Sequence, residues 1–258
     1  MKPTLKMLLY ALLVFIVACS SDDGALPEEN NLINVDNRQS TGDSAFDFLS
    51  EENFTNLFIE VVYVEGFEPS EESLNNLVSF INQRCYKSEG IQISKRAIPS
   101  TGKSSYTVEE IDKLEKDVRI QYNSNKQLAL FALFLNGSYN NGNEDAMVLG
   151  VAYRNTSFVI FEEEIHNFNN TITGSNLVLF ESTVLRHEFC HLLGLVDLGS
   201  EMQTDHLDTE NGHHCNVESC LMNHEIEFGF NLGNVASEAN IPQLDDHCLA
   251  DLRANGGR

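Results

Sequence analysis

The chain has 258 residues and a formal net charge of −23, with 39 acidic against 16 basic side chains. This length is sufficient for one well-buried domain of about 200 residues with a short extension. A surface this acidic repels phosphate backbones, which argues against nucleic acid as a partner. The composition is otherwise that of a globular protein and gives no sign of a repeat array or fibre.

The N-terminus has the pattern of a secretion signal. Lys2 and Lys6 precede an apolar run from Met7 to Ala18, which is too short to span a bilayer. The run ends in "IVAC", and this sequence resembles a bacterial lipobox. The resemblance implies a lipoprotein signal peptide at 1–18 and a membrane anchor through a lipid on Cys19, with an ordinary signal peptide cut elsewhere as the alternative.

Residues 19–52 are polar and acidic and lack hydrophobic periodicity, which is typical of a flexible tether. The acidic residues directly after Cys19 resemble the surface-export signals of Bacteroidetes lipoproteins. That resemblance implies the bacterial cell envelope, the outer membrane, and exposure at the cell surface. We expect a single folded domain over 53–258.

Strand and helix patterns alternate along this domain. Residues 57–67 and 90–98 have the composition of strands, rich in β-branched residues or alternating in polarity. Between them, residues 70–86 place apolar side chains at helical spacing. A capping box of Thr107 and Glu110 then predicts a charged helix that extends to about residue 123.

The second half of the domain continues this alternation. Residues 126–137 are uniformly apolar, as expected of a buried central strand. Residues 147–155 and 157–165 predict two more strands, 180–194 a helix, and 243–254 a last helix after an irregular stretch. The order implies an α/β (α+β) fold, with a mixed sheet of about five strands and flanking helices.

The helix at 180–194 carries "HEFCH", with His187, Glu188 and His191. Residues four apart lie on one helix face, so both rings can reach one zinc ion at about 2.0–2.1 Å. Glu188 lies about 100° around the helix from His187, where it can exchange a proton with a water on the metal. The pattern predicts a catalytic zinc site with Glu188 as general base.

The stretch that follows resembles the metzincin metallopeptidases. Their motif is His-Glu-x-x-His-x-x-Gly-x-x-(His or Asp) and a later methionine turn, which matches Gly194 and Met222. "HCNVESCLM" at 214–222 is similar to the archaemetzincin group, although nineteen residues separate Gly194 from His214 where that pattern has two. The resemblance implies a twisted sheet, an irregular C-terminal subdomain, and hydrolysis of peptide or protein substrates.

Two residues compete for the third zinc-ligand position. Asp197 has the expected spacing from His191, and a carboxylate can bind zinc. His214 has the expected spacing from the following Cys and Met, and imidazole is the commoner ligand. We take Asp197 as the first expectation, His214 as the alternative, and His206, between them, as a third.

His224 lies two residues after Met222, where several metzincins have a tyrosine that stabilises the oxyanion. His224 is therefore a candidate for oxyanion support, with a solvated loop histidine as the alternative.

Five cysteines remain after lipidation of Cys19: Cys85, Cys190, Cys215, Cys220 and Cys248. Archaemetzincins bind a second, structural zinc through four cysteines, and Asp245 stands here where one of them would be. His247 could complete such a site with the last three cysteines. Because the expected compartment is oxidising, a disulfide among those three is preferred over a second zinc.

The glutamates at 162–164 are expected at a solvated strand end. If this strand borders the cleft, an extended substrate can pair with it, and the acidic rim would favour basic peptides. The leading hypothesis is a lipid-anchored zinc endopeptidase. The alternatives are a non-catalytic metzincin-like surface binding module and a zinc hydrolase of a non-peptide amide, and no signal specifies an oligomeric state.

Overall fold

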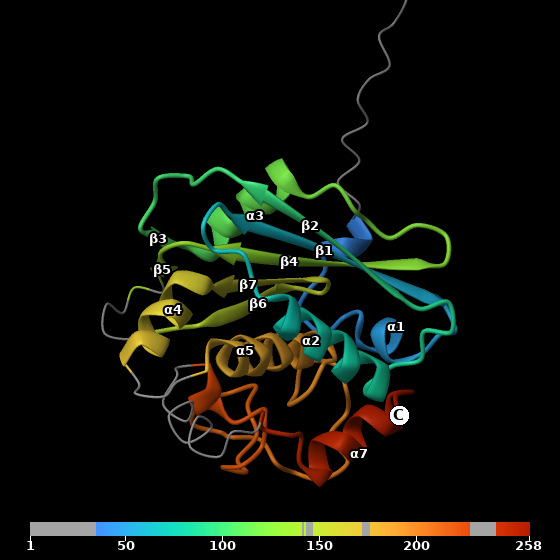
Figure 1. Cartoon of the computed structure of the whole chain (residues 1–258). Helices are drawn as coiled ribbons and strands as arrows, with labels where there is room; N and C mark the ends of the chain where they lie inside the picture. The colour runs from blue at the N-terminus through green and yellow to red at the C-terminus, as the bar shows by residue number, and fades with distance from the viewer. Residues whose placement is uncertain (1–34, 141, 143–146, 172–175, 228–240) are drawn as a thin grey trace, which may run out of the picture. The chain divides into compact units, whose positions relative to one another are not determined.

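The computed structural model describes residues 35–140, 142, 147–171, 176–227 and 241–258 (Figure 1). The chain divides into two compact units, Met1–Leu32 and Ile33–Arg258, and only the second contains described residues. The expected signal peptide at 1–18 and Cys19 therefore lie outside the described residues. Within the described ranges, no helix is both long and apolar enough to cross a membrane.

The domain is built on a five-stranded mixed sheet with the order β2-β1-β4-β7-β6. β1, β2, β4 and β7 are parallel, and β6 runs antiparallel to β7 at one edge. Their bounds are β1 Asn56–Val64, β2 Ile91–Ile98, β4 Gln127–Leu135, β6 Gly150–Arg154 and β7 Ser157–Phe161. β4 is central and eight of its nine residues are buried, which explains its uniformly apolar sequence. The expected mixed sheet is confirmed.

A second, two-stranded parallel sheet lies outside the main one. It pairs β3 (Ser105–Tyr106) with β5 (Ser138–Tyr139).

Helices cover both faces of the main sheet (Figure 1). α2 (Glu71–Arg84) and α5 (Leu177–Leu192) pack on one face, and α3 (Val108–Val118) packs on the other. Alternate residues of β1 point to the two faces, as the period of a strand requires. The last helix is α7 (Asp246–Ala254).

The helix caps follow the sequence signals. The Ser70 side chain accepts a hydrogen bond from the Ser73 N–H at the start of α2. Thr107 and Glu110 form the expected capping box of α3. α3 ends at Val118, earlier than expected, because Arg119 turns its buried guanidinium to the Glu115 carboxylate and the Ala129 carbonyl.

The folded region begins earlier than the expected boundary at residue 53. A 3-10 turn, η1 (Val35–Asn37), and a short helix, α1 (Ala45–Leu49), already belong to it. Phe48 is fully buried, and its ring packs edge-on against Phe189 of α5 at 5.4 Å between centroids. The fold therefore includes part of the segment 19–52 that was expected to be a tether. The sequence does not reveal this, because the few apolar residues here form too short a run to show periodicity.

The segment after β7 also differs from expectation. β7 ends at Phe161, and the glutamates open a helix, α4 (Glu162–Thr171), instead of continuing the strand. Negative side chains in the first turn are favourable because they lie near the positive end of the helix dipole. Glu162 is fully buried, so the expected solvated acidic rim is wrong for this residue.

A sharp turn at Gly194 follows the end of α5. Gly194 has φ +73°, and its carbonyl accepts a hydrogen bond from the Ser200 N–H at 2.8 Å. A Cβ at this position would lie 2.6 Å from the Ser200 nitrogen, so only glycine fits without a shift. Beyond it the chain is irregular, with a short 3-10 turn, η2 (His224–Ile226), before α7.

Candidate metal centre

Two buried histidines of α5 face each other. The Nε2 atoms of His187 and His191 lie 3.1 Å apart. A tetrahedral metal with bonds of about 2.0–2.1 Å would hold two such nitrogens about 3.3 Å apart. The four-residue spacing on the helix therefore positions both rings for one cation.

His214 completes this group. Its ring lies 5.3 Å from the ring of His187 and 5.2 Å from that of His191, and the three residues offer ligand atoms within 4.8 Å of one another. Among the described residues, these three could hold one metal ion. The group thus takes two histidines from α5 and one from the irregular region.

Backbone carbonyls fix the orientation of two of these rings. Nδ1 of His187 is 2.8 Å from the Leu221 carbonyl, and Nδ1 of His214 is 2.7 Å from the Gly212 carbonyl. A histidine that donates one ring N–H to a carbonyl directs the lone pair of its other nitrogen to a metal. The Nε2 atom of His187 is thereby directed to His191, and that of His214 lies 3.1 Å from a carboxylate oxygen of Glu227.

The structure brings His214, and not the first expectation Asp197, to the two histidines of α5. Asp197 is exposed and lies outside the histidine group, which contains the alternative, His214. After Gly194 the chain continues through Val196 and Asp197 at φ +55° and +69°, so the turn extends beyond the position where a ligand was expected. The residues between Gly194 and His214 therefore precede the third histidine of the group, and local spacing does not reveal this.

Glu188 lies beside the histidines and against the edge strand β6. It is buried, and a Cβ on Gly150 would lie 2.6 Å from its Oε1. Burial, together with the negative charge of Glu227, raises the pKa of Glu188 well above its usual value. The missing side chain of Gly150 gives the carboxylate its space.

A cavity opens in front of this group. It is lined by β6 on one side and by the metal-centre region on the other, including Val151, Ala152, Glu188, His191, His214 and Glu227. A substrate in this cavity would therefore contact the edge strand, Glu188 and two of the histidines.

The turn around Met222 contacts the histidine group through its backbone carbonyls. Met222 is fully buried, and its carbonyl accepts a hydrogen bond from the Cys215 N–H at 2.7 Å. Leu221, directly before it, provides the carbonyl that orients His187. The expected Met-turn residue thus lies in a turn that positions two of the three histidines.

His224, the candidate for oxyanion support, lies near the centre. Its ring is 6.4 Å from that of His214, and its Nδ1 is 3.2 Å from a carboxylate oxygen of Asp208. The interaction with Asp208 orients the ring, and the oxyanion role stays a prediction.

The donor set fits a catalytic zinc ion. Oε1 of the buried Glu188 makes no hydrogen bond, whereas Nε2 of His214 lies 3.1 Å from a carboxylate oxygen of Glu227. An unsatisfied buried oxygen is costly, and a water bound to a cation would engage it. Three imidazoles with an open fourth position are characteristic of catalytic sites, whereas structural zinc sites are closed.

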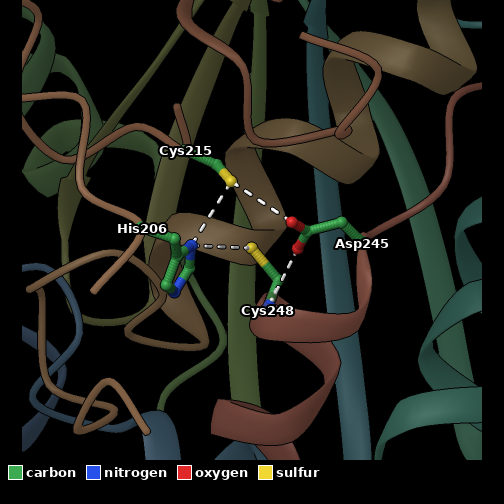
Figure 2. Close-up of side chains that lie close together, drawn as sticks. All are labelled: His206, Cys215, Asp245 and Cys248. Carbon is green, nitrogen blue, oxygen red and sulfur yellow. Dashed lines mark hydrogen bonds between the residues drawn. The ribbon is translucent and has the colours of Figure 1, made fainter. Parts of the chain in front are cut away.

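A second cluster consists of His206, Cys215, Asp245 and Cys248, whose ligand atoms lie within 4.8 Å of one another (Figure 2). Nδ1 of His206 lies 3.3 Å from Sγ of Cys215 and 3.8 Å from Sγ of Cys248. Cys220 is adjacent, with its Sγ 3.7 Å from that of Cys248. His206 and the three cysteines are buried, whereas Asp245 is partly exposed.

The expected disulfide is not formed. All five described cysteines are free, and the 3.7 Å between Cys220 and Cys248 exceeds the disulfide bond length of about 2.0 Å. The sulfurs of Cys215 and Cys248 instead lie near Nδ1 of His206. His247, the expected fourth member, bonds to Thr204 Oγ1 at 2.6 Å and stacks on His206 from outside.

Two acidic residues support this cluster. Nε2 of His206 is 2.8 Å from the buried Asp251 carboxylate, an arrangement that turns Nδ1 to the cysteines. Asp245 caps α7 by accepting from the Cys248 N–H at 2.9 Å, and it also accepts from Cys215 Sγ at 3.6 Å. Sequence reasoning missed Asp251 because its partner lies 45 residues away.

The assignment of the third histidine predicts opposite results for two substitutions. His214→Ala should weaken cation binding at this centre. Removing a residue that only hydrogen-bonds to a metal ligand costs roughly 10–100-fold in affinity, and the loss of His214 itself should cost more. Asp197→Ala should leave binding unchanged, because that carboxylate is exposed. Zinc bound per chain, measured across a chelator-buffered series, checks both. Loss in Asp197→Ala with retention in His214→Ala would reverse the assignment.

No protein-family model and no curated protein matches the chain. Among solved structures, the fold is similar to that of archaemetzincin from Methanopyrus kandleri, with a TM-score of 0.50 and 13% sequence identity; the match covers 78% of this chain and 96% of that one. A zinc-dependent peptidase from Methanocorpusculum labreanum has a TM-score of 0.49 and 15% identity, covering 75% and 99%. The fold of this chain is archaemetzincin-like.

Proposed function

We propose that the chain is a zinc-dependent peptidase that hydrolyses peptide bonds with Glu188 as general base. The observation that carries this proposal is the convergence of His187, His191 and His214 beside a buried carboxylate that has no structural partner for Oε1. The archaemetzincin-like fold supports it. When bound, zinc lowers the pKa of a coordinated water to about 7 and polarises the carbonyl of the substrate.

The other steps are assigned to the histidines, which bind the cation, and to Glu188, which transfers the proton. The three histidines hold the cation, and the carbonyls of Leu221 and Gly212 keep two of the rings in the required orientation. Glu188 accepts the proton of the attacking water and passes it to the leaving amine. A pure binding module needs no such carboxylate, so Glu188 favours an enzyme over that alternative.

The edge strand β6 is suited to hold the substrate. It pairs with β7 on one side only, and Val151 and Ala152 on it line the cavity. An extended peptide can add to such an edge through backbone hydrogen bonds, which places a peptide bond next to Glu188. This arrangement favours a peptide over a small non-peptide amide.

Replacing the carboxylate tests the mechanism directly. Glu188→Gln keeps the volume of the side chain but cannot accept the proton, so peptide cleavage should fall by about 10²–10⁴-fold with zinc retained. Cleavage of a peptide library and zinc content measure the two effects. Glu201→Gln, an exposed residue after α5, is the control and should match the wild type. Full activity of Glu188→Gln would refute the mechanism, and chelator-insensitive cleavage would refute the zinc enzyme.

We infer that His206, Cys215, Cys220 and Cys248 bind a second, structural zinc. Three sulfurs and one nitrogen make a closed four-ligand set of the kind found in structural sites. Hydrogen bonds with the thiols of Cys215 and Cys248 lower the pKa of the Cys220 thiol and raise the pKa of the other two, so the group favours one thiolate, the form that binds a metal. Asp251 supplies the outer partner of the histidine.

His206 and its stacked neighbour give a matched pair for this inference. His206→Ala should lose one zinc per chain and lower the melting temperature, because the cation connects the inserted segment to α7. His247→Ala should bind as much zinc per chain as the wild type. Absorption of the cobalt-substituted protein in the thiolate charge-transfer region reports the site. Equal zinc content and equal absorption in the two variants would eliminate His206 as a ligand.

We also propose that a lipid on Cys19 anchors the chain to the bacterial envelope, at the outer membrane and facing outward. The lipobox-like "IVAC" and the acidic residues after it support this location.

Cys19→Ser should abolish incorporation of a labelled fatty acid and move the protein out of the membrane fraction. Cys85→Ser is the control, because Cys85 is buried inside the domain. Fatty-acid labelling that persists in Cys19→Ser would contradict the anchor.

A further inference from the structure

A third group of ligand-type side chains lies between α4 and α5, apart from both clusters described above. It consists of Glu162 and His166, one turn apart on α4, and Glu181 on α5. Their carboxylate oxygens and ring nitrogen lie within 4.8 Å of one another. The two helices are packed together here, and the rings of Phe168 and Phe180 meet edge to face at 5.5 Å.

Glu162 is buried without adequate partners. It is 0% exposed, and neither of its carboxylate oxygens makes a hydrogen bond of good geometry. Its nearest basic group is Nε2 of His166, 3.1 Å from Oε1. In the described part of the chain, no lysine or arginine forms an ion pair with Glu162 or Glu181. A buried carboxylate in this state is costly unless another positive charge is present.

Glu181 has donors for only one of its oxygens. Its Oε2 accepts from the Ser70 N–H at 3.1 Å and from the Ser70 hydroxyl at 2.5 Å. Among the described residues, the hydrogen bonds of Glu181 involve Oε2 and not Oε1. Oε1 is therefore available to a ligand that Glu181 shares with Glu162.

Two carboxyl groups this close require a proton or a cation between them. Burial, with the charge of Glu181, raises the pKa of Glu162 to about 8, although His166 opposes this rise. A divalent cation would neutralise both carboxylates and accept the lone pair of the imidazole at the same time.

We propose that Glu162, His166 and Glu181 bind a divalent first-row transition-metal cation of the Zn²⁺ or Mn²⁺ type. Carboxylate and imidazole together suit these ions. Ca²⁺ fits poorly, because it requires about six to eight oxygen ligands. His166 is partly exposed, with 33% of its side-chain surface accessible, and so provides an entry path from solvent.

The position of this site indicates a structural role. Glu181 lies on α5, six residues before His187, and Ser70 is the N-cap of α2. A cation held here would join α4 to the helix that carries the catalytic histidines, and through Ser70 it would also fix the start of α2. This proposal concerns binding and stability, and it does not rest on the peptidase activity.

Metal counting in the full chain tests the proposal. Glu162→Gln and Glu181→Gln should each lose one equivalent of bound zinc relative to the wild type and should lose the thermal stabilisation that added Zn²⁺ gives at this site. Glu164→Gln is the matched control, since it makes the same charge change on the same helix outside the cluster. Mn²⁺ binding followed by electron paramagnetic resonance should show the same loss of one site.

A second variant protects the test against misfolding. His166→Ala changes a partly exposed side chain, so it should fold and still lose the same equivalent. Circular dichroism confirms that each variant is folded. If His166→Ala and the folded glutamate variants bind as much zinc and manganese as the wild type and Glu164→Gln, the proposal is overturned and the two carboxyl groups share a proton instead.

Discussion

The hydrogen bond between Nδ1 of His187 and the Leu221 carbonyl joins the two halves of the metal centre. It connects α5, which supplies two histidines, to the turn at Met222. The Met222 carbonyl in turn accepts from the N–H of Cys215, the residue after His214. Two adjacent backbone carbonyls therefore fix the third histidine relative to the other two, and the centre depends on the turn as much as on the helix.

The burial of α5 makes this arrangement rigid. Fourteen of its sixteen residues are buried, so the helix cannot rotate without disturbing the core on every side. At its start Glu181 accepts from Ser70, and beyond its end Gly194 accepts from Ser200. Because His187 and His191 lie between these two fixed ends, small changes at either end would alter their geometry. Contacts that hold the two ends of α5 therefore also hold the two histidines in position.

The sequence predicted what depends on local pattern. The apolar run of β4, the capping box of α3 and the four-residue histidine spacing on α5 all formed as expected, because each requires only neighbouring residues. Expectations failed where a distant contact decided the outcome. Glu162 was expected in solvent, but it faces Glu181; Asp197 had the right spacing, but an insertion displaced the ligand role.

The segment that ends at His214 contributes to both groups of ligand-type side chains. His214 reaches the two histidines of α5, and His206 places its Nδ1 3.3 Å from Sγ of Cys215. On α7, Asp251 holds His206 in this orientation, and Asp245 caps the helix by accepting from the Cys248 N–H. The N–H of Cys215 in turn donates to the Met222 carbonyl. Because one residue, Cys215, belongs to the cysteine group and also contacts the turn at Met222, a displacement of α7 would disturb the turn that orients the histidines.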